Sequence, residues 1–160
     1  MLNYIQQLQK LIDSLRSLRV NKRNLLYSMA QRCIGQSFVQ NVSKEFGCAE
    51  SIDRVYFKTF GKYIGGGPNP EISTSKMYYS LLNSKDFIKV SEPKEGTIII
   101  SPSGSGNGKI ANGHVGCCGL GYIMSNNSLT GRWDIKWSLN TWKEYYGGRG
   151  GFPVYFFDVV

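Results

Sequence analysis

Residues 97–118 read TIIISPSGSGNGKIANGHVGCC, and this stretch decides the fold class. Its first five residues are mostly β-branched, which is typical of a buried strand. A loop rich in glycine and serine follows, and residues 114–118 then form a second apolar run. Two such runs separated by a glycine-containing loop predict two β-strands.

The remainder of the chain divides into predicted helices before this stretch and predicted strands mostly after it. A helical pattern covers residues 2–33, and a second helix at 24–34 follows or continues it. Two further helices are predicted, from Cys48 to Gly61 and from Ser73 or Thr74 to Leu82. Further strands are predicted at 87–90, 122–125, 133–137 and 152–159. This order indicates an α+β fold in which N-terminal helices pack on an antiparallel sheet.

The N-terminal segment is predicted to be a helical arm over residues 1–34, followed by one domain over residues 35–160. Its apolar residues recur three and four positions apart, namely Leu2, Ile5, Leu8, Leu11, Ile12, Leu15 and Leu18. Such a stripe either packs on the domain or forms a short coiled coil that joins chains into an oligomer. We expect packing on the domain, which is the commoner arrangement.

Composition limits the possible partners and locations of the protein. The net charge is +8 over 160 residues, which favours polyanionic partners or serves only solubility, since the basic residues are scattered. No apolar stretch is long enough to span a membrane, and the N-terminal residues do not resemble a signal peptide. We therefore expect a protein that is made in the cytoplasm.

The four cysteines do not predict a metal site, a cofactor or a disulfide framework. Cys33, Cys48, Cys117 and Cys118 show no CxxC spacing, and the chain has a single histidine. Cys117 and Cys118 are neighbours, and a bridge between neighbours is strained. We expect free thiols, with Cys33 and Cys118 in the core.

Cys48 is the candidate nucleophile. It follows Gly47 and begins a predicted helix, where unpaired backbone N–H groups and the helix dipole favour the thiolate and lower the thiol pKa. Gly47 allows another chain or a substrate to approach closely. The alternative is a small buried cysteine, which is the commoner fate of this residue.

His114 is the candidate base, because a cysteine hydrolase needs an imidazole to accept the thiol proton and to protonate the leaving amine. A third polar group should orient this imidazole. Asn126 is the first choice, Asn127 the second, and Asp134 is further along the chain. Trp133, Trp137 and Trp142 are candidates for sugar or peptide contact, or for core packing.

The loop sequence GSGNGK at 104–109 does not form a phosphate-binding loop. That motif requires a glycine five residues before Gly108, where the chain has Ser103. Ile110 also stands where the motif has a magnesium-binding Ser or Thr. We interpret it as a flexible loop beside the site.

From about Gly35 onward, the chain resembles the cell-wall cysteine peptidases of the CHAP and NlpC type, including members in phages. The motifs that carry the resemblance are GCAES at 47–51, ISTSKMYYSLL at 72–82, EPKEGTIIISP at 92–102, GHVG at 113–116, IMSNNS at 123–128 and FPVYFFDV at 152–159. The family's usual Pro-Gly-Asp turn is replaced here by Glu95-Gly96-Thr97.

The resemblance implies a papain-like core and hydrolysis of an amide bond in peptidoglycan. In this comparison Cys48 corresponds to the nucleophile, His114 to the base and Asn126 to the polar third residue. It implies a phage or phage-derived endopeptidase or amidase that needs no cofactor, binds wall polymer rather than nucleic acid, and acts at the bacterial wall after release. The alternatives are a cysteine protease, deamidase or acyltransferase on another substrate, and a non-enzymatic virion module.

Overall fold

The computed structural model describes residues 2–160. Met1 of the predicted arm lies outside these residues, as do the side chains of Leu2, Arg19, Val20 and Asn21. The helices are α1 Leu2–Arg32, α2 Cys48–Phe60, α3 Thr74–Asn83 and α4 Leu139–Trp142, together with the 3-10 helix η1 Lys44–Phe46 and the π-helix η2 Lys143–Arg149. The strands are β1 Phe87–Val90, β2 Ile98–Ser101, β3 His114–Cys118, β4 Ile123–Asn126, β5 Trp133–Trp137 and β6 Tyr155–Val159.

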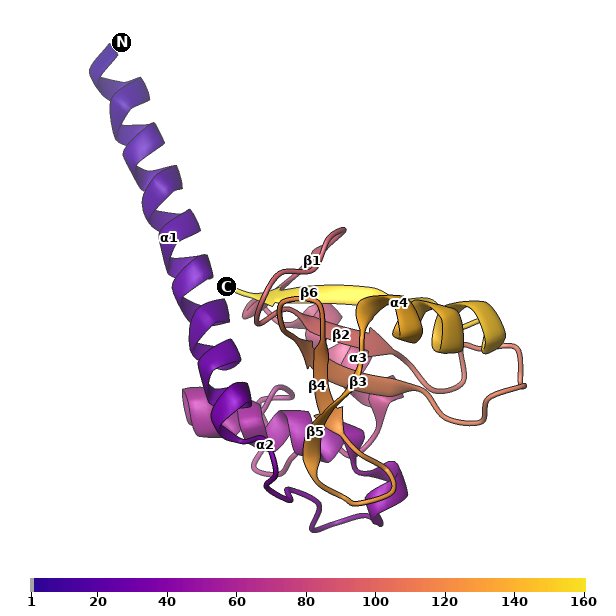
Figure 1. Ribbon diagram of the computed structural model, residues 1–160. Helices are drawn as coiled ribbons and strands as arrows, with labels where there is room; N and C mark the ends of the chain where they lie inside the picture. Colours follow the sequence, from indigo (N-terminus) through magenta and orange to yellow (C-terminus); the bar gives the residue numbers. More distant parts are fainter. Residues whose placement is uncertain (1) are drawn as a thin grey trace.

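These strands form one sheet in the order β1-β6-β2-β3-β4-β5, and every neighbouring pair is antiparallel (Figure 1). The predicted α+β class with an antiparallel sheet is confirmed. The strands predicted at 87–90, 114–118 and 133–137 have the predicted bounds. The last predicted strand is shorter, because residues 152–154 precede β6.

The central strands are buried on both faces of the sheet. In β2, Ile98 and Ile100 belong to one core cluster with α2, whereas Ile99 belongs to a second cluster with Trp142 of α4. This alternation follows from the period of two along a strand, which sends successive side chains to opposite faces. We call the first the helix face and the second the aromatic face.

The helix face is covered by α2, α3 and the second part of α1. Helix α2 ends at Gly61, whose positive φ of 72° is the left-handed conformation common after a helix. Helix α3 begins after Ser73, whose side chain accepts the Lys76 N–H, as expected for a capping serine. Both boundaries agree with the sequence prediction.

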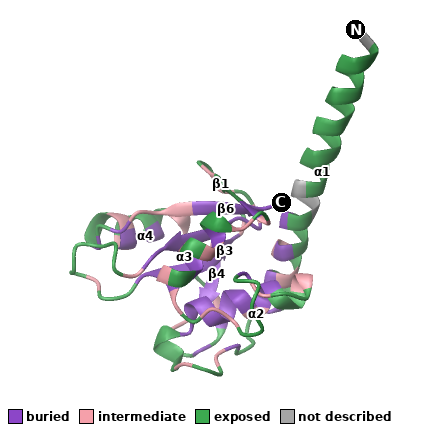
Figure 2. Ribbon diagram, turned by 180° about the vertical axis from the view of Figure 1, so that it is seen from behind, coloured by how far each residue is buried: buried purple, intermediate pink, exposed green. Residues whose placement is uncertain are grey.

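The first part of α1 projects away from the domain (Figures 1 and 2). The apolar side chains of this part are exposed, from Tyr4, at 67%, to Leu18, at 55%. The preference for packing this stripe on the domain is therefore wrong for residues 4–18. The predicted boundary between residues 34 and 35 stays a prediction.

Packing begins at Arg23, in the middle of the continuous helix. The Arg23 guanidinium is buried, donates from Nε to the Glu95 carbonyl at 2.8 Å and lies 3.6 Å from the Asp158 carboxylate. Asp158 also accepts the Thr97 hydroxyl at 2.6 Å. This buried network fixes α1 to the sheet, and Leu26, Ala30 and Cys33 then enter the core.

The aromatic face is covered by an element that the sequence did not predict. Ser138 caps α4 through reciprocal hydrogen bonds with Thr141, and the chain continues directly into the π-helix η2. Trp142 and Tyr146 of this segment are buried against the sheet. The segment is short and contains Gly147 and Gly148, so its helical pattern is weak.

Among residues 2–160, no helix is long and apolar enough to cross a membrane.

Candidate functional site

Cys48 lies at the N-terminus of α2 with 8% of its surface exposed. Burial raises the pKa of its thiol to about 11, although the backbone N–H groups of Ala49, Val115 and Cys48 itself act in the opposite direction. The predicted N–H donors are therefore present, but the net shift is opposite in sign to the prediction. The resting form at neutral pH is the thiol.

Gly47 is required by the close packing in front of Cys48. A Cβ at this position would lie 2.3 Å from Val39 Cγ2 and 3.3 Å from Asn126 Nδ2. The predicted close approach at Gly47 is thus made by the protein's own segments. It brings the end of β4 against the start of α2.

His114 is the first residue of β3 and points to the aromatic face. Its ring stacks on Trp142 and Tyr146, with centroid distances of 5.1 and 5.6 Å. Trp142 is held in turn by a hydrogen bond from its Nε1 to Ser101 Oγ at 3.1 Å. Burial, and to a lesser extent the Lys136 charge, lowers the pKa of His114 to about 3, so the imidazole is neutral at pH 7.

Ser125 holds the imidazole, with its Oγ 3.0 Å from His114 Nε2. Ser125 pairs with Gly116, so His114, Gly116 and Ser125 share one face of adjacent strands. A Cβ at Gly116 would lie 2.6 Å from the Met124 carbonyl oxygen and 3.1 Å from Ser125 Cβ, so the neighbouring strand leaves no room for a side chain here. Nε2 is therefore occupied, and among residues 2–160 no hydrogen bond to Nδ1 is present.

Asn126 lines the same pocket as His114 but forms hydrogen bonds elsewhere. Its Nδ2 donates to the Lys44 carbonyl at 2.8 Å, and its Oδ1 accepts the Ser51 hydroxyl at 3.5 Å. Asn127 donates to Asp134 at 3.4 Å and accepts the Leu129 N–H. The hydrogen bond to the imidazole comes from Ser125 instead, so the orienting role of Asn126 stays a prediction.

The strand register is the signal that would have indicated Ser125. Residues 114, 116 and 118 of β3 share a face with residues 123 and 125 of β4, because Gly116 lies opposite Ser125 and Cys118 opposite Ile123. Asn126 belongs to the alternate face. The predicted candidate Asn126 lies on the correct strand, one residue away from the face that His114 shares with Ser125.

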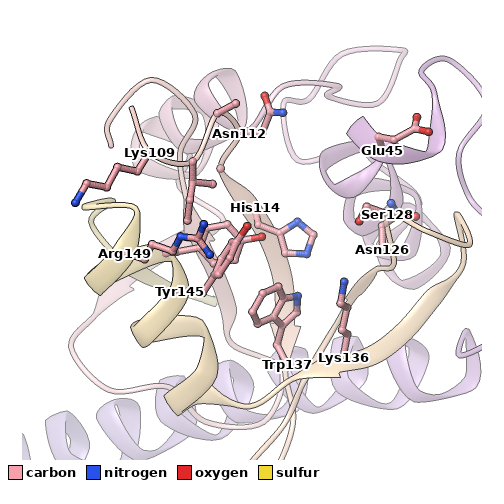
Figure 3. A pocket seen from close by; sticks show the side chains of 14 residues that line it. Glu45, Lys109, Asn112, His114, Asn126, Ser128, Lys136, Trp137, Tyr145 and Arg149 are labelled. Atoms are coloured by element: carbon pink, nitrogen blue, oxygen red, sulfur yellow. The ribbon is translucent and has the colours of Figure 1, made fainter. Parts of the chain in front are cut away.

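Two adjoining pockets open on either side of the pair. The first, of about 330 Å³, contains His114, and the second, of about 270 Å³, contains Cys48. Both are lined by Glu45, Asn112 and Gly113, so the two pockets are adjacent. Figure 3 shows the His114 ring in the middle of the first pocket, between Tyr145 and Arg149 on one side and Asn126 on the other.

The nucleophile and base candidates approach from opposite faces of the sheet. Cys48 belongs to the cluster on the helix face, and the Val115 N–H points to its sulfur from the residue next to His114. Among residues 2–160, no hydrogen bond is present between Cys48 Sγ and the His114 ring. The arrangement is a neutral thiol beside the start of the strand that carries a neutral imidazole, and catalytic hydrogen bonds often shorten only when substrate binds.

The other candidates divide between pocket and core. Trp137 lines the His114 pocket, whereas Trp133 and Trp142 are fully buried. Cys33 and Cys118 are buried, as predicted, and Cys117 is buried as well; all three are free thiols. In the part of the chain that the structure describes, no three His, Cys, Asp or Glu side chains are grouped so that they could hold a metal ion.

No family model and no curated protein matches this chain.

Proposed function

We propose that the protein is a cysteine-dependent amide hydrolase with a papain-like core, and that its substrate is peptidoglycan. The observation that carries the proposal is the placement of Cys48 at a helix N-terminus, against the start of the strand that begins with His114. Two adjoining pockets leave room for a substrate on both sides of this pair. A helix-borne thiol and a strand-borne imidazole are the arrangement of papain-like hydrolases.

The reaction begins as the Cys48 sulfur attacks the amide carbonyl carbon while His114 Nδ1 accepts the thiol proton. The resulting oxyanion is held by the Cys48 backbone N–H, which has no intrahelical partner in the first turn. The intermediate collapses to a thioester as the imidazolium gives its proton to the leaving amine. Water, activated by the imidazole, then hydrolyses the thioester and releases the acid.

The neutral resting pair favours general-base catalysis over a preformed ion pair. A thiol with a pKa of about 11 has almost no thiolate at neutral pH, so the imidazole has to accept the proton as attack occurs. Ser125 supports this role, because its oxygen can accept the Nε2 proton and leave Nδ1 unprotonated.

Two features support peptidoglycan as the substrate. The order of the GCAES, GHVG and IMSNNS motifs resembles that of wall peptidases, and the charge of +8 suits an anionic wall. The test is digestion of purified bacterial walls with the wild-type protein and with Cys48→Ala, followed by mass spectrometry. New amine and carboxyl termini in the wild-type digest alone are expected.

Other outcomes of that digestion favour different functions. Amide hydrolysis of a protein or lipid substrate without release of wall fragments would favour a cysteine protease, deamidase or acyltransferase. Equal wall lysis by Cys48→Ala would contradict the proposed nucleophile. The exposed apolar stripe on α1 is the one observation that favours an assembly role in a virion, and it is compatible with either activity.

A further inference from the structure

The two pockets have different electrostatic character. The pocket at His114 is lined by Lys109, Lys136 and Arg149, with Glu45 as its one carboxylate among residues 2–160. The pocket at Cys48 shares Glu45 but has no lysine or arginine in its lining. A substrate that spans both pockets therefore meets a cationic environment on one side only.

The three cations come from separate elements that border one pocket. The Lys136 side chain points toward His114, whereas the Lys109 ammonium points away from it (Figure 3). Lys109 lies in the loop before β3, Lys136 in β5 and Arg149 at the end of η2 (Figure 3). Within the described chain, none of them forms a salt bridge with an acidic side chain. Their charges are therefore available to a ligand.

Aromatic rings support two of these cations. Lys136 Nζ lies 5.7 Å from the centroid of Trp137, and Arg149 Cζ lies 5.8 Å from that of Tyr145. Such contacts hold a cation over a ring face while its N–H groups remain free to donate. An arginine held in this way can bind a carboxylate with two parallel hydrogen bonds.

The chemistry of the proposed reaction assigns the cationic pocket to one half of the substrate. The acyl carbon bonds to the Cys48 sulfur, and the leaving nitrogen receives its proton from His114. The amine half of the substrate must therefore extend from His114 into the pocket that His114 lines. The acyl half occupies the pocket at Cys48.

We propose that the pocket at His114 selects a carboxylate on the amine half of the substrate, so that the released product is an amino acid or peptide with a free carboxylate near its new amino group. This inference rests on the proposed function. Burial is the larger cause of the lowered pKa of His114, and a carboxylate bound at Lys136 would offset the smaller one, the Lys136 charge.

The test uses two synthetic peptides that share the acyl half and the scissile amide. One has a free carboxylate on its amine half and the other has a carboxamide there. We expect kcat/KM to be about tenfold higher for the carboxylate peptide, which corresponds to one well-placed charge interaction. Lys136→Met and Arg149→Met should each reduce this ratio, whereas Lys76→Met, an exposed lysine of α3 outside both pockets, should leave it unchanged.

Equal hydrolysis of the two peptides by the wild-type protein would overturn the inference and leave the proposed function intact. Hydrolysis of neither peptide would count against the proposed function, and binding then decides the inference. Calorimetry with the Cys48→Ala protein should show tighter binding of the carboxylate peptide, and this preference should weaken in Cys48→Ala/Arg149→Met. Equal affinity for both peptides, or no binding of either, would overturn the inference.

Discussion

The two faces of the sheet hold the two proposed catalytic groups in different ways. On the helix face, Cys48 is positioned by backbone, at the first residue of α2 and against the Val115 N–H. On the aromatic face, His114 is positioned by side chains, namely Trp142, Tyr146 and Ser125. The base should therefore be sensitive to single substitutions around it, whereas the nucleophile should be sensitive mainly to its own replacement.

The largest expected effect is that of Cys48→Ala, which removes the reacting sulfur. Amide hydrolysis should fall at least about 10³-fold, as is common when a catalytic nucleophile is lost. Cys33→Ala is the matched control, because Cys33 is also a buried thiol on the helix face. Cys33→Ala should retain most of the activity, and a comparable loss in both variants would contradict the assignment of Cys48.

Two buried tryptophans allow the faces to be compared directly. Trp142 packs on His114 and donates to Ser101, whereas Trp133 lies on the helix face and donates to the Ala30 carbonyl at 3.0 Å. Trp142→Phe and Trp133→Phe should each lower the free energy of unfolding by about 1–3 kcal/mol, measured by urea denaturation, because each leaves a buried acceptor without its donor.

Only Trp142→Phe should also lower kcat under conditions in which both variants are folded. A similar fall in kcat for Trp133→Phe would show that the two faces are not independent.

Ser125 and Asn126 provide a comparison within β4. Ser125→Ala removes the hydrogen bond to His114 Nε2 and should lower kcat about tenfold, with a changed pH profile and partial recovery in Ser125→Thr. Asn126→Ala should have a smaller effect on kcat, because the side-chain amide of Asn126 forms hydrogen bonds with Lys44 and Ser51 and none with His114. A larger loss for Asn126→Ala, with an altered pH profile, would restore Asn126 as the orienting residue.

The last expected effect concerns stability against pH. The folded pKa of His114 is about 3, below its ordinary value of 6.5, so the unfolded chain binds a proton that the folded protein does not bind between these values. Stability from this group is present above pH 6.5 and is lost as pH falls toward 3, by at most about 1.4 kcal/mol per pH unit.

Urea titrations from pH 7 to 4 should therefore show a shallower decline for His114→Gln than for the wild-type protein. Identical slopes would contradict a buried neutral imidazole.

Most of the fold followed from local patterns in the sequence. The β-branched run at residues 98–100 predicted strand β2, and Gly61 predicted the end of helix α2. Both predictions were possible because strand patterns and helix ends depend on nearby residues. The π-helix at 143–149 could not be predicted, since its stability comes from Trp142 and Tyr146 packing on a sheet that is distant in sequence.

The candidate site was predictable only in part. The helix N-terminus at Cys48 and the strand start at His114 are local features, and both lie where the sequence placed them. The sign of the Cys48 pKa shift depends on burial by distant segments, and the choice of Ser125 depends on the register of β3 and β4. Neither quantity is encoded in the neighbouring residues alone.

The most direct test of the central claim is the rate at which iodoacetamide alkylates each cysteine at pH 7, mapped by peptide mass spectrometry in the wild-type protein and in His114→Gln. A buried thiol with a pKa of about 11 should be almost inert unless a nearby base accepts its proton. We expect Cys48 to react fastest of the four cysteines and His114→Gln to slow its alkylation about tenfold or more. A Cys48 that reacts no faster than Cys33, or at the same rate in His114→Gln, would contradict the account.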